Sequence, residues 1–207
     1  ITFHVKQRMI QLMMKTEDRN IEKYIDLLFL YNREVNLFSR KLMRSDIVEL
    51  VNESFLLAEH ITTDLVIDAG SGNGLLGVPI GLHYNKKKVI LVETREKKNI
   101  YLKKILTDLA VENITLFSGG IKNFFNENKM SDLLSVVARG FPDNYKLAAF
   151  LNHTNVKEVL LISILDKIKK RNISVDKFEK YVYNIPSKDK LKIIKLENVS
   201  RGTIKKK

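Results

Sequence analysis

At 207 residues with 44% hydrophobic content, the chain is long enough to bury one sizeable core. It has no cysteine, which excludes a disulfide framework and thiolate catalysis, and its four histidines never fall at a metal-ligand spacing such as H-x-x-H. Because we find no signal peptide and no stretch of about 18 apolar residues, we expect a cytoplasmic protein that binds no membrane. We also expect a monomer, and the histidine spacing predicts no metal site.

The charge balance is strongly basic, with 36 Lys and Arg residues against 24 Asp and Glu residues and a formal net charge of +12. A charge of this sign and size indicates a polyanionic partner such as RNA, because phosphates attract clustered cations. The many Lys and Asn residues also fit a bias in codon usage, which would raise the charge without any ligand.

The first 60 residues are predicted to be mainly helical. Apolar residues recur with helical spacing over 21–28 and again over 47–58, with charged residues between them. Ser45 is a candidate N-cap for the second helix. The period fades over 31–37, where two asparagines and several charges predict a turn. We expect residues 1–60 to form a helical cap over one face of a sheet.

The stretch from Asp64 to Gly77, DLVIDAGSGNGLLG, has the order of a nucleotide-binding opening. A buried strand over 64–69 precedes the glycines, and residues 75–82 are predicted to form a helix. Five of the nine glycines of the chain fall in or just after this stretch. Glycine lets a backbone pass close to a ligand, and a helix N-terminus offers free N–H groups.

Two cofactors compete for this turn. Gly72, Gly74 and Gly77 match the dinucleotide fingerprint G-x-G-x-x-G, but that fingerprint should begin directly after the strand, and here other residues intervene. Asp68 at the strand end, followed by G-x-G-x-G, suits S-adenosylmethionine (SAM) better, because the ammonium of SAM attracts a carboxylate. Glu93 ends the next strand and can accept hydrogen bonds from the ribose hydroxyls of either cofactor. The sequence favours SAM and leaves NAD open.

Beyond the turn, apolar strands alternate with helical patterns, which predicts a parallel sheet with right-handed crossovers. The further strands are predicted at 89–92, 114–117, 133–138 and 156–163, and the helices at 95–109, at 121–126 and from Pro142. In the helix over 95–109, the residues expected to face inward are Ile100, Leu102, Ile105, Leu106 and Leu109, and those expected to face outward are Lys97, Lys98, Lys103 and Lys104.

The end of the chain has a different pattern. Residues 177–185 and 191–199 are strand-like runs separated by a turn at 186–189, which is typical of a hairpin. The whole pattern predicts a doubly wound, Rossmann-like α/β fold of the SAM-dependent methyltransferase type. Its sheet would be seven-stranded and mostly parallel, with an antiparallel C-terminal strand, and N-terminal helices would precede it. We expect the methyltransferase domain to span 61–200, followed by a basic tail at 201–207.

Ligands of doubly wound folds bind at the carboxyl ends of the central strands. Asp68, Glu93, Ser118 and Arg139 are all predicted to lie at such ends. An arginine that closes a buried strand indicates an anionic or electron-rich group in front of it. The alternative is an ion pair with Asp132, Asp143 or another acid.

Four motifs follow one another in a specific order and spacing: Tyr31-Asn32 with Asn36-Leu37, the turn from Asp68 to Gly77, Glu93 followed by Lys97-Lys98 and Leu102, and Val137-Ala138-Arg139. In this combination the chain, from about 21 to 199, resembles the bacterial 16S rRNA (guanine-N7) methyltransferases, the glucose-inhibited division protein B family. The resemblance implies a SAM-dependent enzyme that methylates a guanine in a loop of the small-subunit rRNA near the decoding centre.

The resemblance also implies a site. Gly70 and Leu75 would touch the cofactor, Glu93 would hold its ribose, and Ile121 and Lys122 would flank the adenine. Arg139 would lie near both cofactor and substrate, which makes it the candidate catalytic residue. Together with the turn, the candidate cofactor-binding set is Asp68, Gly70, Gly72, Gly74, Leu75, Glu93, Ile121, Lys122 and Arg139.

Guanine N7 carries a free lone pair, so methyl transfer to it needs alignment of the reacting atoms and no general base. Arg139 would donate to the base edge or to a phosphate, and its replacement by alanine is expected to leave folding nearly intact. Gly120 and Ile162 stand where the family usually has polar residues. An RNA-binding protein that retains SAM with weak or no turnover is therefore the alternative function, and an NAD-dependent oxidoreductase is the third.

Overall fold

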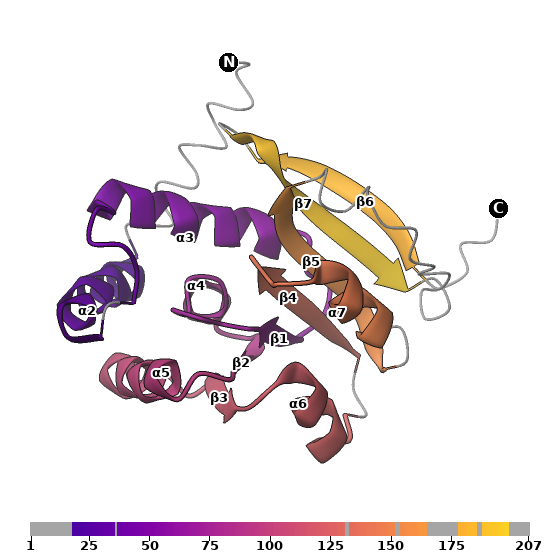
Figure 1. Cartoon of the computed structure of the whole chain (residues 1–207), viewed down its shortest axis with the longest axis horizontal. Helices are drawn as coiled ribbons and strands as arrows, with labels where there is room; N and C mark the ends of the chain where they lie inside the picture. Colours follow the sequence, from indigo (N-terminus) through magenta and orange to yellow (C-terminus); the bar gives the residue numbers. More distant parts are fainter. Residues whose placement is uncertain are drawn as a thin grey trace.

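Seven strands form one sheet (Figure 1). They are β1 (Leu65–Ala69), β2 (Lys88–Glu93), β3 (Ile114–Ser118), β4 (Leu134–Arg139), β5 (Val156–Ile164), β6 (Phe178–Ile185) and β7 (Lys188–Asn198). Their order in the sheet is β3-β2-β1-β4-β5-β7-β6. The first five strands pair in parallel, whereas β7 runs antiparallel to both β5 and β6. The predicted, mostly parallel sheet with one antiparallel C-terminal strand is confirmed.

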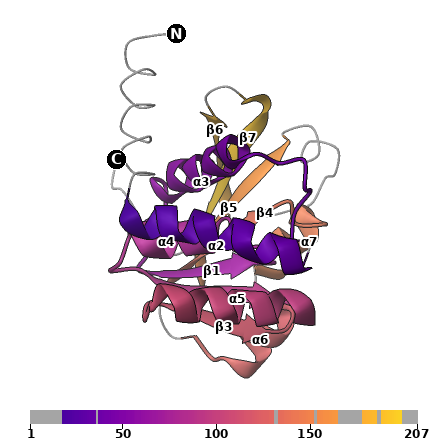
Figure 2. The ribbon, with the colours of Figure 1, turned by 90° about the vertical axis from the view of Figure 1, so that its left-hand side faces the viewer.

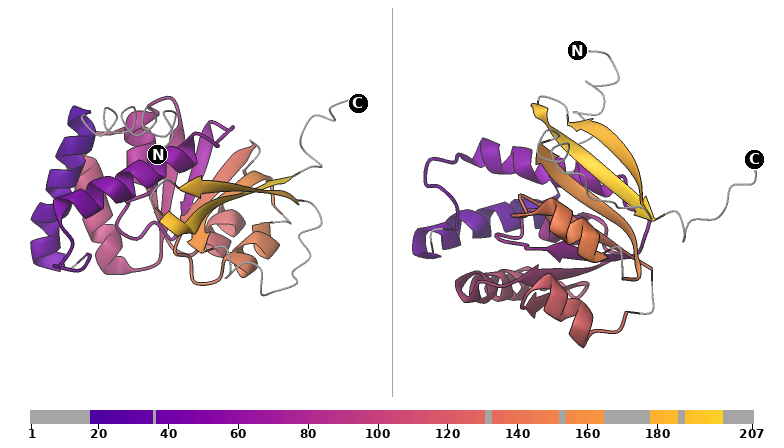
Figure 3. Two further views of the ribbon diagram at one scale, coloured as in Figure 1. Left: turned by 90° about the horizontal axis from the view of Figure 1, so that it is seen from above. Right: turned by 45° about the vertical axis from the view of Figure 1, so that its right-hand side comes forward.

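The computed structural model describes residues 18–35, 37–130, 133–151, 154–164, 178–185 and 188–198. The predictions for residues 1–17, for the loop at 186–187 and for the basic tail at 201–207 lie outside these residues, as do Asn36 and Asp132. Figure 3 shows the pair of strands β6 and β7 extending the sheet beyond β5.

The central strands are apolar because both faces of the sheet are covered. In β1, Val66 belongs to the hydrophobic core on one face and Ile67 to the core on the other face. The strand order reverses between β1 and β4, where Asp68 is the register partner of Val137. The connections that leave the carboxyl ends of β1 and β4 therefore diverge at a topological switch point, the place where doubly wound folds bind ligands.

Helices cover both faces of the sheet (Figures 1 and 2). One face carries α2 (Arg19–Val35), α3 (Arg44–Ala58), α4 (Gly77–His83) and α5 (Glu96–Leu109), and the other carries α6 (Ile121–Glu127) and α7 (Asn144–Leu151). In Figure 2, α2 lies between α3 and α5, and it contacts α3, α4 and α5. None of the helices in the described residues is long and apolar enough to cross a membrane. The division of the chain at residue 60 stays a prediction.

The predicted turn over 31–37 is wrong for its first part, because α2 continues to Val35. Tyr31 is buried on the inner face of this helix, and its hydroxyl donates a hydrogen bond to Asp108 of α5. This packing contact keeps the segment helical although its local sequence resembles a turn.

Two other local predictions are also wrong. Ser45 lies inside α3, which begins at Arg44; at the N-cap, the Met43 N–H donates to Asp46 Oδ2 at 2.7 Å. Ile100 of α5 is 64% exposed, because the neighbouring Tyr101 takes the inward position and its ring packs edge-on against Tyr31.

A buried charged network joins three strands to the segment before β1. Glu158 of β5 is fully buried and accepts hydrogen bonds from the Thr62 N–H and the Ser135 hydroxyl, each at 2.6 Å. Lys195 Nζ of β7 lies 2.7 Å from Glu158 Oε2. Burial alone would raise the pKa of Glu158, but the hydrogen bonds from Lys195, Ser135 and Thr62 outweigh it and lower that pKa.

Replacing Lys195 with methionine should lower the free energy of unfolding at pH 7 by about 3–5 kcal/mol, because it leaves a buried carboxylate without its cation. The pKa of Glu158 is lowered in the folded protein, so its contribution is present above the unfolded-state value of about 4.3 and is lost on acidification below it. Urea unfolding at pH 7 and pH 4 should therefore show a smaller difference between wild type and variant at pH 4.

Lys192→Met is the matched control, because Lys192 is a partly exposed lysine on the same strand. Its effect should stay within about 0.5 kcal/mol. Equal losses for the two variants, or a loss for Lys195→Met that does not change with pH, would contradict the account of this network.

Candidate active site

A cleft of about 720 Å³ lies at the carboxyl ends of β1, β2 and β4, at the switch point. It brings together residues from the glycine-rich turn, from the end of β2, from the start of α6 and from the end of β4. The predicted site residues that line it are Asp68, Gly70, Gly72, Leu75, Glu93, Ile121, Lys122 and Arg139. Gly74 is absent from the lining. The sequence therefore predicted residues that converge in space although they span 72 positions from first to last.

The glycine-rich turn is held against β2 by its own backbone. The N–H groups of Gly70 and Ser71 both donate to the Val92 carbonyl, at 2.8 and 3.0 Å. Gly72 faces the cleft with a φ of +60°, a conformation that side chains other than glycine rarely adopt. Its N–H donates to Glu93 Oε2 at 2.8 Å, so the backbone of the turn and the carboxylate of β2 form one wall of the cleft.

Gly74 has a different role from Gly72. A Cβ atom at this position would lie 2.9 Å from Val78 and 3.0 Å from Leu102, both of which belong to the helices behind the turn. The Tyr24 hydroxyl of α2 donates to the carbonyl of the neighbouring Asn73 at 3.2 Å. Gly74 thus allows the turn to pack against helices, and an N-terminal helix supports the turn from behind.

Asp68 is buried, and its Oδ2 accepts a hydrogen bond of 2.9 Å from the Gly77 N–H at the start of α4. Burial raises the pKa of Asp68 to about 7, the Gly77 hydrogen bond opposes this rise, and the charge of Glu93 adds to it. A cation in the cleft would stabilise the ionised form of Asp68. The residue therefore both fixes the turn and offers a favourable partner to a positively charged ligand.

Glu93 is also buried, and each of its carboxylate oxygens has a partner on the backbone. Oε2 accepts from Gly72, as described above, and Oε1 accepts from the Arg95 N–H at 2.9 Å. The Asn99 side chain donates to the Glu93 carbonyl at 3.0 Å. These contacts fix the orientation of the carboxylate, which still has acceptor capacity for the hydroxyls of a ligand.

Arg139 lines the cleft, but its guanidinium already has protein partners. Nη2 forms an ion pair with Glu53 of α3, and Nη1 donates to the Leu50 carbonyl at 3.2 Å. Burial lowers the pKa of Arg139 to about 10, against the opposing charge of Glu49. The alternative of an ion pair, which the sequence left open for Arg139, is therefore present in the structure, with Glu53 as the acid. Arg139 forms this ion pair and also lines the cleft.

Sequence reasoning missed two contributors to the cleft. Phe141 follows β4, and its ring lies 3.4 Å from the position that a Cβ on Gly70 would occupy. Lys98 was expected on the solvated face of α5, yet it lines the cleft, and its Nζ lies 3.4 Å from the Cβ position of Gly72. Burial lowers the pKa of Lys98, and the nearby Glu93 opposes this shift. The place of Phe141 two residues after β4 is a signal that would have found it, whereas Lys98 lies inside α5, where its sequence pattern matches that of the solvated lysines.

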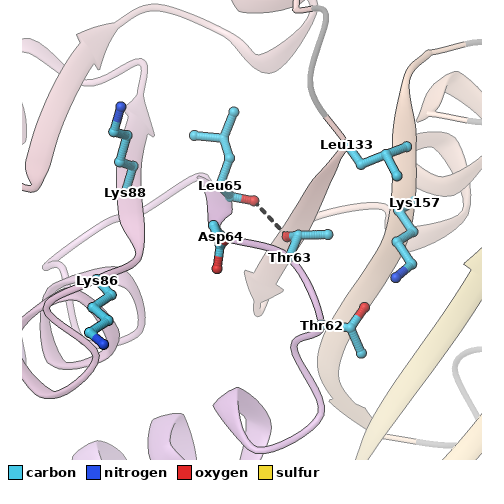
Figure 4. Close-up of a pocket in the computed structure, with 8 residues that line it drawn as sticks. All are labelled: Thr62, Thr63, Asp64, Leu65, Lys86, Lys88, Leu133 and Lys157. Atoms are coloured by element: carbon cyan, nitrogen blue, oxygen red, sulfur yellow. Dashed lines mark hydrogen bonds between the residues drawn. The ribbon is translucent and has the colours of Figure 1, made fainter.

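A second hollow, of about 370 Å³, lies at the amino ends of the parallel strands, on the opposite side of the sheet from the cleft at their carboxyl ends (Figure 4). Lys86, Lys88 and Lys157 surround it, but Figure 4 shows their amino groups pointing in different directions rather than toward one point. This hollow therefore has the charge of an anion site without its geometry. In the described part of the chain, no group of three or more acidic or histidine side chains is placed to hold a metal ion.

Solved structures show that the chain shares a Rossmann-like fold with proteins that are named as methyltransferases. Precorrin-6y C5,15-methyltransferase from Geobacter metallireducens superposes with a TM-score of 0.54 at 13% identity, over 77% of this chain and 92% of that chain. The M. capricolum protein TrmK, solved in complex with S-adenosyl-homocysteine, superposes with a TM-score of 0.54 at 15% identity, over 71% of this chain and 67% of that chain.

The family follows from the sequence. A model of the family described as rRNA small subunit methyltransferase G (GidB) matches residues 17–194, and the chain belongs to this family. The ribosomal RNA small subunit methyltransferase G of Lawsonia intracellularis is 32% identical over 146 residues, covering 66% of this chain and 68% of the relative. The Vibrio vulnificus protein of the same name is 28% identical over 130 residues, covering 63% and 60%. The alignments thus span 60–68% of these relatives' own length.

Proposed function

We propose that this protein is a SAM-dependent methyltransferase that modifies N7 of a guanine in the 16S rRNA of the small ribosomal subunit. The observation that carries the proposal is the cleft at the switch point, in which the glycine-rich turn and Glu93 face each other in a chain of the rRNA small subunit methyltransferase G family. We further propose that it acts in the cytoplasm as a monomer.

The donor groups of the cleft fit SAM. Its volume of about 720 Å³ lies within the usual range for small-molecule sites. Gly72 leaves open the space that a side chain would fill, and Asp68 and Glu93 supply negative charge to a cofactor whose sulfonium and ammonium groups are positive. We assign Asp68 to the ammonium, Glu93 to the ribose, and Ile121 and Lys122 to the adenine.

A dinucleotide cofactor such as NAD fits the cleft less well than SAM. In the fingerprint Gly72-x-Gly74-x-x-Gly77, the second glycine should let the backbone approach the pyrophosphate. Gly74 instead packs against Val78 and Leu102, away from the cleft lining. The first glycine after β1 that lines the cleft is Gly70, which directly follows the strand. This is the position that the G-x-G-x-G motif of a SAM site predicts.

The residues of this chain would bind and orient the reactants rather than move a proton. SAM, when bound, supplies an electrophilic methyl group, and guanine N7 supplies a lone pair that carries no proton to remove. The guanidinium of Arg139 has five N–H groups, of which Glu53 and the Leu50 carbonyl use part, so others remain for the guanine O6 or a phosphate. Phe141 beside the turn offers an aromatic face against which a base can stack.

The cationic residues at the cleft fit an RNA substrate. Arg95, Lys98, Lys122 and Arg139 line it, whereas the acids of the lining are Asp68 and Glu93. Since each neutralised phosphate releases counterions, the logarithm of the binding constant should fall by about 0.7–0.9 per phosphate for each tenfold rise in salt. We expect RNA binding to be steeply salt-dependent.

Arg95→Gln should weaken binding to a small-subunit rRNA fragment and reduce its salt slope by about one. Lys86→Gln, which removes the same charge at the opposite edge of the sheet, should leave the slope unchanged. Filter binding across a salt series measures both. A flat salt response in the wild type, or equal changes in both variants, would mean that the positive charge is unrelated to RNA.

The function itself is tested by transfer of radiolabelled methyl groups from SAM to small subunits that lack N7-methylguanine, with large subunits as the control. We expect label in the small-subunit RNA alone. SAM and RNA binding without transfer would favour the RNA-binding alternative, and binding of a nicotinamide cofactor in place of SAM would favour an oxidoreductase.

A further inference from the structure

The carboxylate of Glu53 is the most deeply placed acid beside the cleft that the proposed chemistry does not use. Its side chain is only 3% exposed, in the second half of α3, and it forms an ion pair with Arg139 at the carboxyl end of β4. An isolated charge in such a place is costly, so a buried carboxylate normally has a specific partner. Here the partner is the candidate catalytic residue.

The same helix supplies a second acceptor to that arginine. The Leu50 carbonyl, one turn before Glu53, accepts a hydrogen bond of 3.2 Å from Arg139 Nη1, while Glu53 binds Nη2. A carbonyl that accepts a hydrogen bond and a carboxylate that forms an ion pair, both on one rigid helix, restrict the rotation of the guanidinium, because its N–H groups have a fixed geometry. The orientation of Arg139 in the cleft is therefore set by α3 rather than by its own strand.

A third element stabilises the carboxylate. Lys188, the first residue of β7, places its Nζ 3.9 Å from Glu53 Oε1 and 3.2 Å from Glu49 Oε2. In Figure 1, one end of α3 lies next to β5 and β7. The ion pairs of Glu53 with Arg139 and Lys188 thus join an N-terminal helix, the cleft and the C-terminal hairpin.

We propose that Glu53 is a positioning residue for methyl transfer, which holds the guanidinium of Arg139 in the orientation that the target guanine or its phosphate requires. The proposal rests on the function proposed above and on the role given there to Arg139. Without Glu53, the long arginine side chain has to be ordered at the moment of reaction, and that ordering lowers the rate.

Glu53→Gln keeps the size of the side chain and one acceptor oxygen but removes the charge. The substitution removes the ion pair that holds the guanidinium, and we expect kcat to fall about tenfold. The dissociation constant for SAM should not change, because Glu53 is absent from the cleft lining. The matched control is Glu22→Gln on α2, a partly exposed acid whose ion pair is with Arg44; its kcat should change less than about twofold.

The experiment is a double-mutant cycle on kcat with Glu53→Gln and Arg139→Gln, alongside SAM calorimetry and melting curves. If Glu53 acts through Arg139, Glu53→Gln lowers kcat in the wild-type background and has no further effect in the Arg139→Gln background. A fall of the same size in both backgrounds, or unchanged kcat in Glu53→Gln, overturns the proposal and leaves Glu53 a structural residue.

Two controls keep the result interpretable. If Glu53→Gln does not fold, Glu53→Asp takes its place, because it keeps the charge but withdraws the carboxylate by one methylene; normal kcat in that variant overturns the proposal. If wild-type protein transfers no methyl group at all, the proposed function fails. If wild type is active and Arg139→Gln is equally active, the roles of Arg139 and Glu53 fail, while the proposed methyltransferase function stands.

Discussion

Gly72→Val should reduce the affinity for SAM about a hundredfold or more. Gly72 adopts a φ of +60° and lines the cleft, so a branched side chain there both strains the backbone and projects into the cofactor space. The nearest protein atom to its Cβ would be Lys98 Nζ at 3.4 Å, the mobile end of a long side chain, so the added side chain meets no rigid neighbour and the cost to folding is the backbone strain of about 1–2 kcal/mol. The substitution should therefore lower the affinity for SAM more than it lowers the free energy of unfolding.

Isothermal titration calorimetry measures the affinity for SAM, and melting curves measure the stability of the same variants. Gly72→Ala is the control, because it also places a Cβ at this positive φ but adds only a single carbon, and we expect it to retain most of the affinity that Gly72→Val loses. Equal SAM affinity in wild type and Gly72→Val would mean that the cofactor does not pass over this glycine, and the site assignment would then be wrong.

Arg139→Ala should lower methyl transfer about ten- to a hundredfold. The loss of a charge-assisted hydrogen bond to the substrate accounts for roughly 1.5–3 kcal/mol. The structure corrects the accompanying expectation of near-normal stability. Among the described residues, the variant leaves the buried Glu53 carboxylate with Lys188, at 3.9 Å, as its remaining ion-pair partner. Removal of one partner of a buried ion pair typically costs about 3–5 kcal/mol, so the melting temperature should fall clearly.

A second substitution separates the two effects. In Arg139→Ala combined with Glu53→Gln, both charges are gone, so most of the lost stability should return while methyl transfer stays low. Melting curves and radiolabelled transfer at a temperature where all variants are folded provide the measurement. Recovery of activity together with stability would show that Arg139 has a structural role only.

The amino-acid sequence was sufficient to predict the sheet and part of the lining of the cleft. Short apolar runs predicted the strands, and the glycine cluster after Asp68 predicted the turn, because both signals are local. Parallel strands then bring their carboxyl ends to one edge, so Glu93 and Arg139 could be assigned to the same cleft without any knowledge of side-chain contacts.

Partners from distant parts of the chain could not be predicted. Glu53 meets Arg139 across the boundary between α3 and the sheet, and Glu158 meets Thr62 from a position 96 residues away. Periodicity reports which face of a helix is buried, but it does not report which buried polar group lies opposite. The same limit explains Tyr31, whose contact with Asp108 extends α2 through a segment that resembles a turn.

The most direct test of the account is to identify the modified nucleoside. Small subunits that lack N7-methylguanine are incubated with the protein and SAM, and the 16S rRNA is digested and analysed by mass spectrometry. The account predicts that N7-methylguanosine appears in the small-subunit RNA and that Gly72→Val protein fails to produce it. Methylation of another atom or of large-subunit RNA, or its complete absence with protein that binds SAM, would contradict the account.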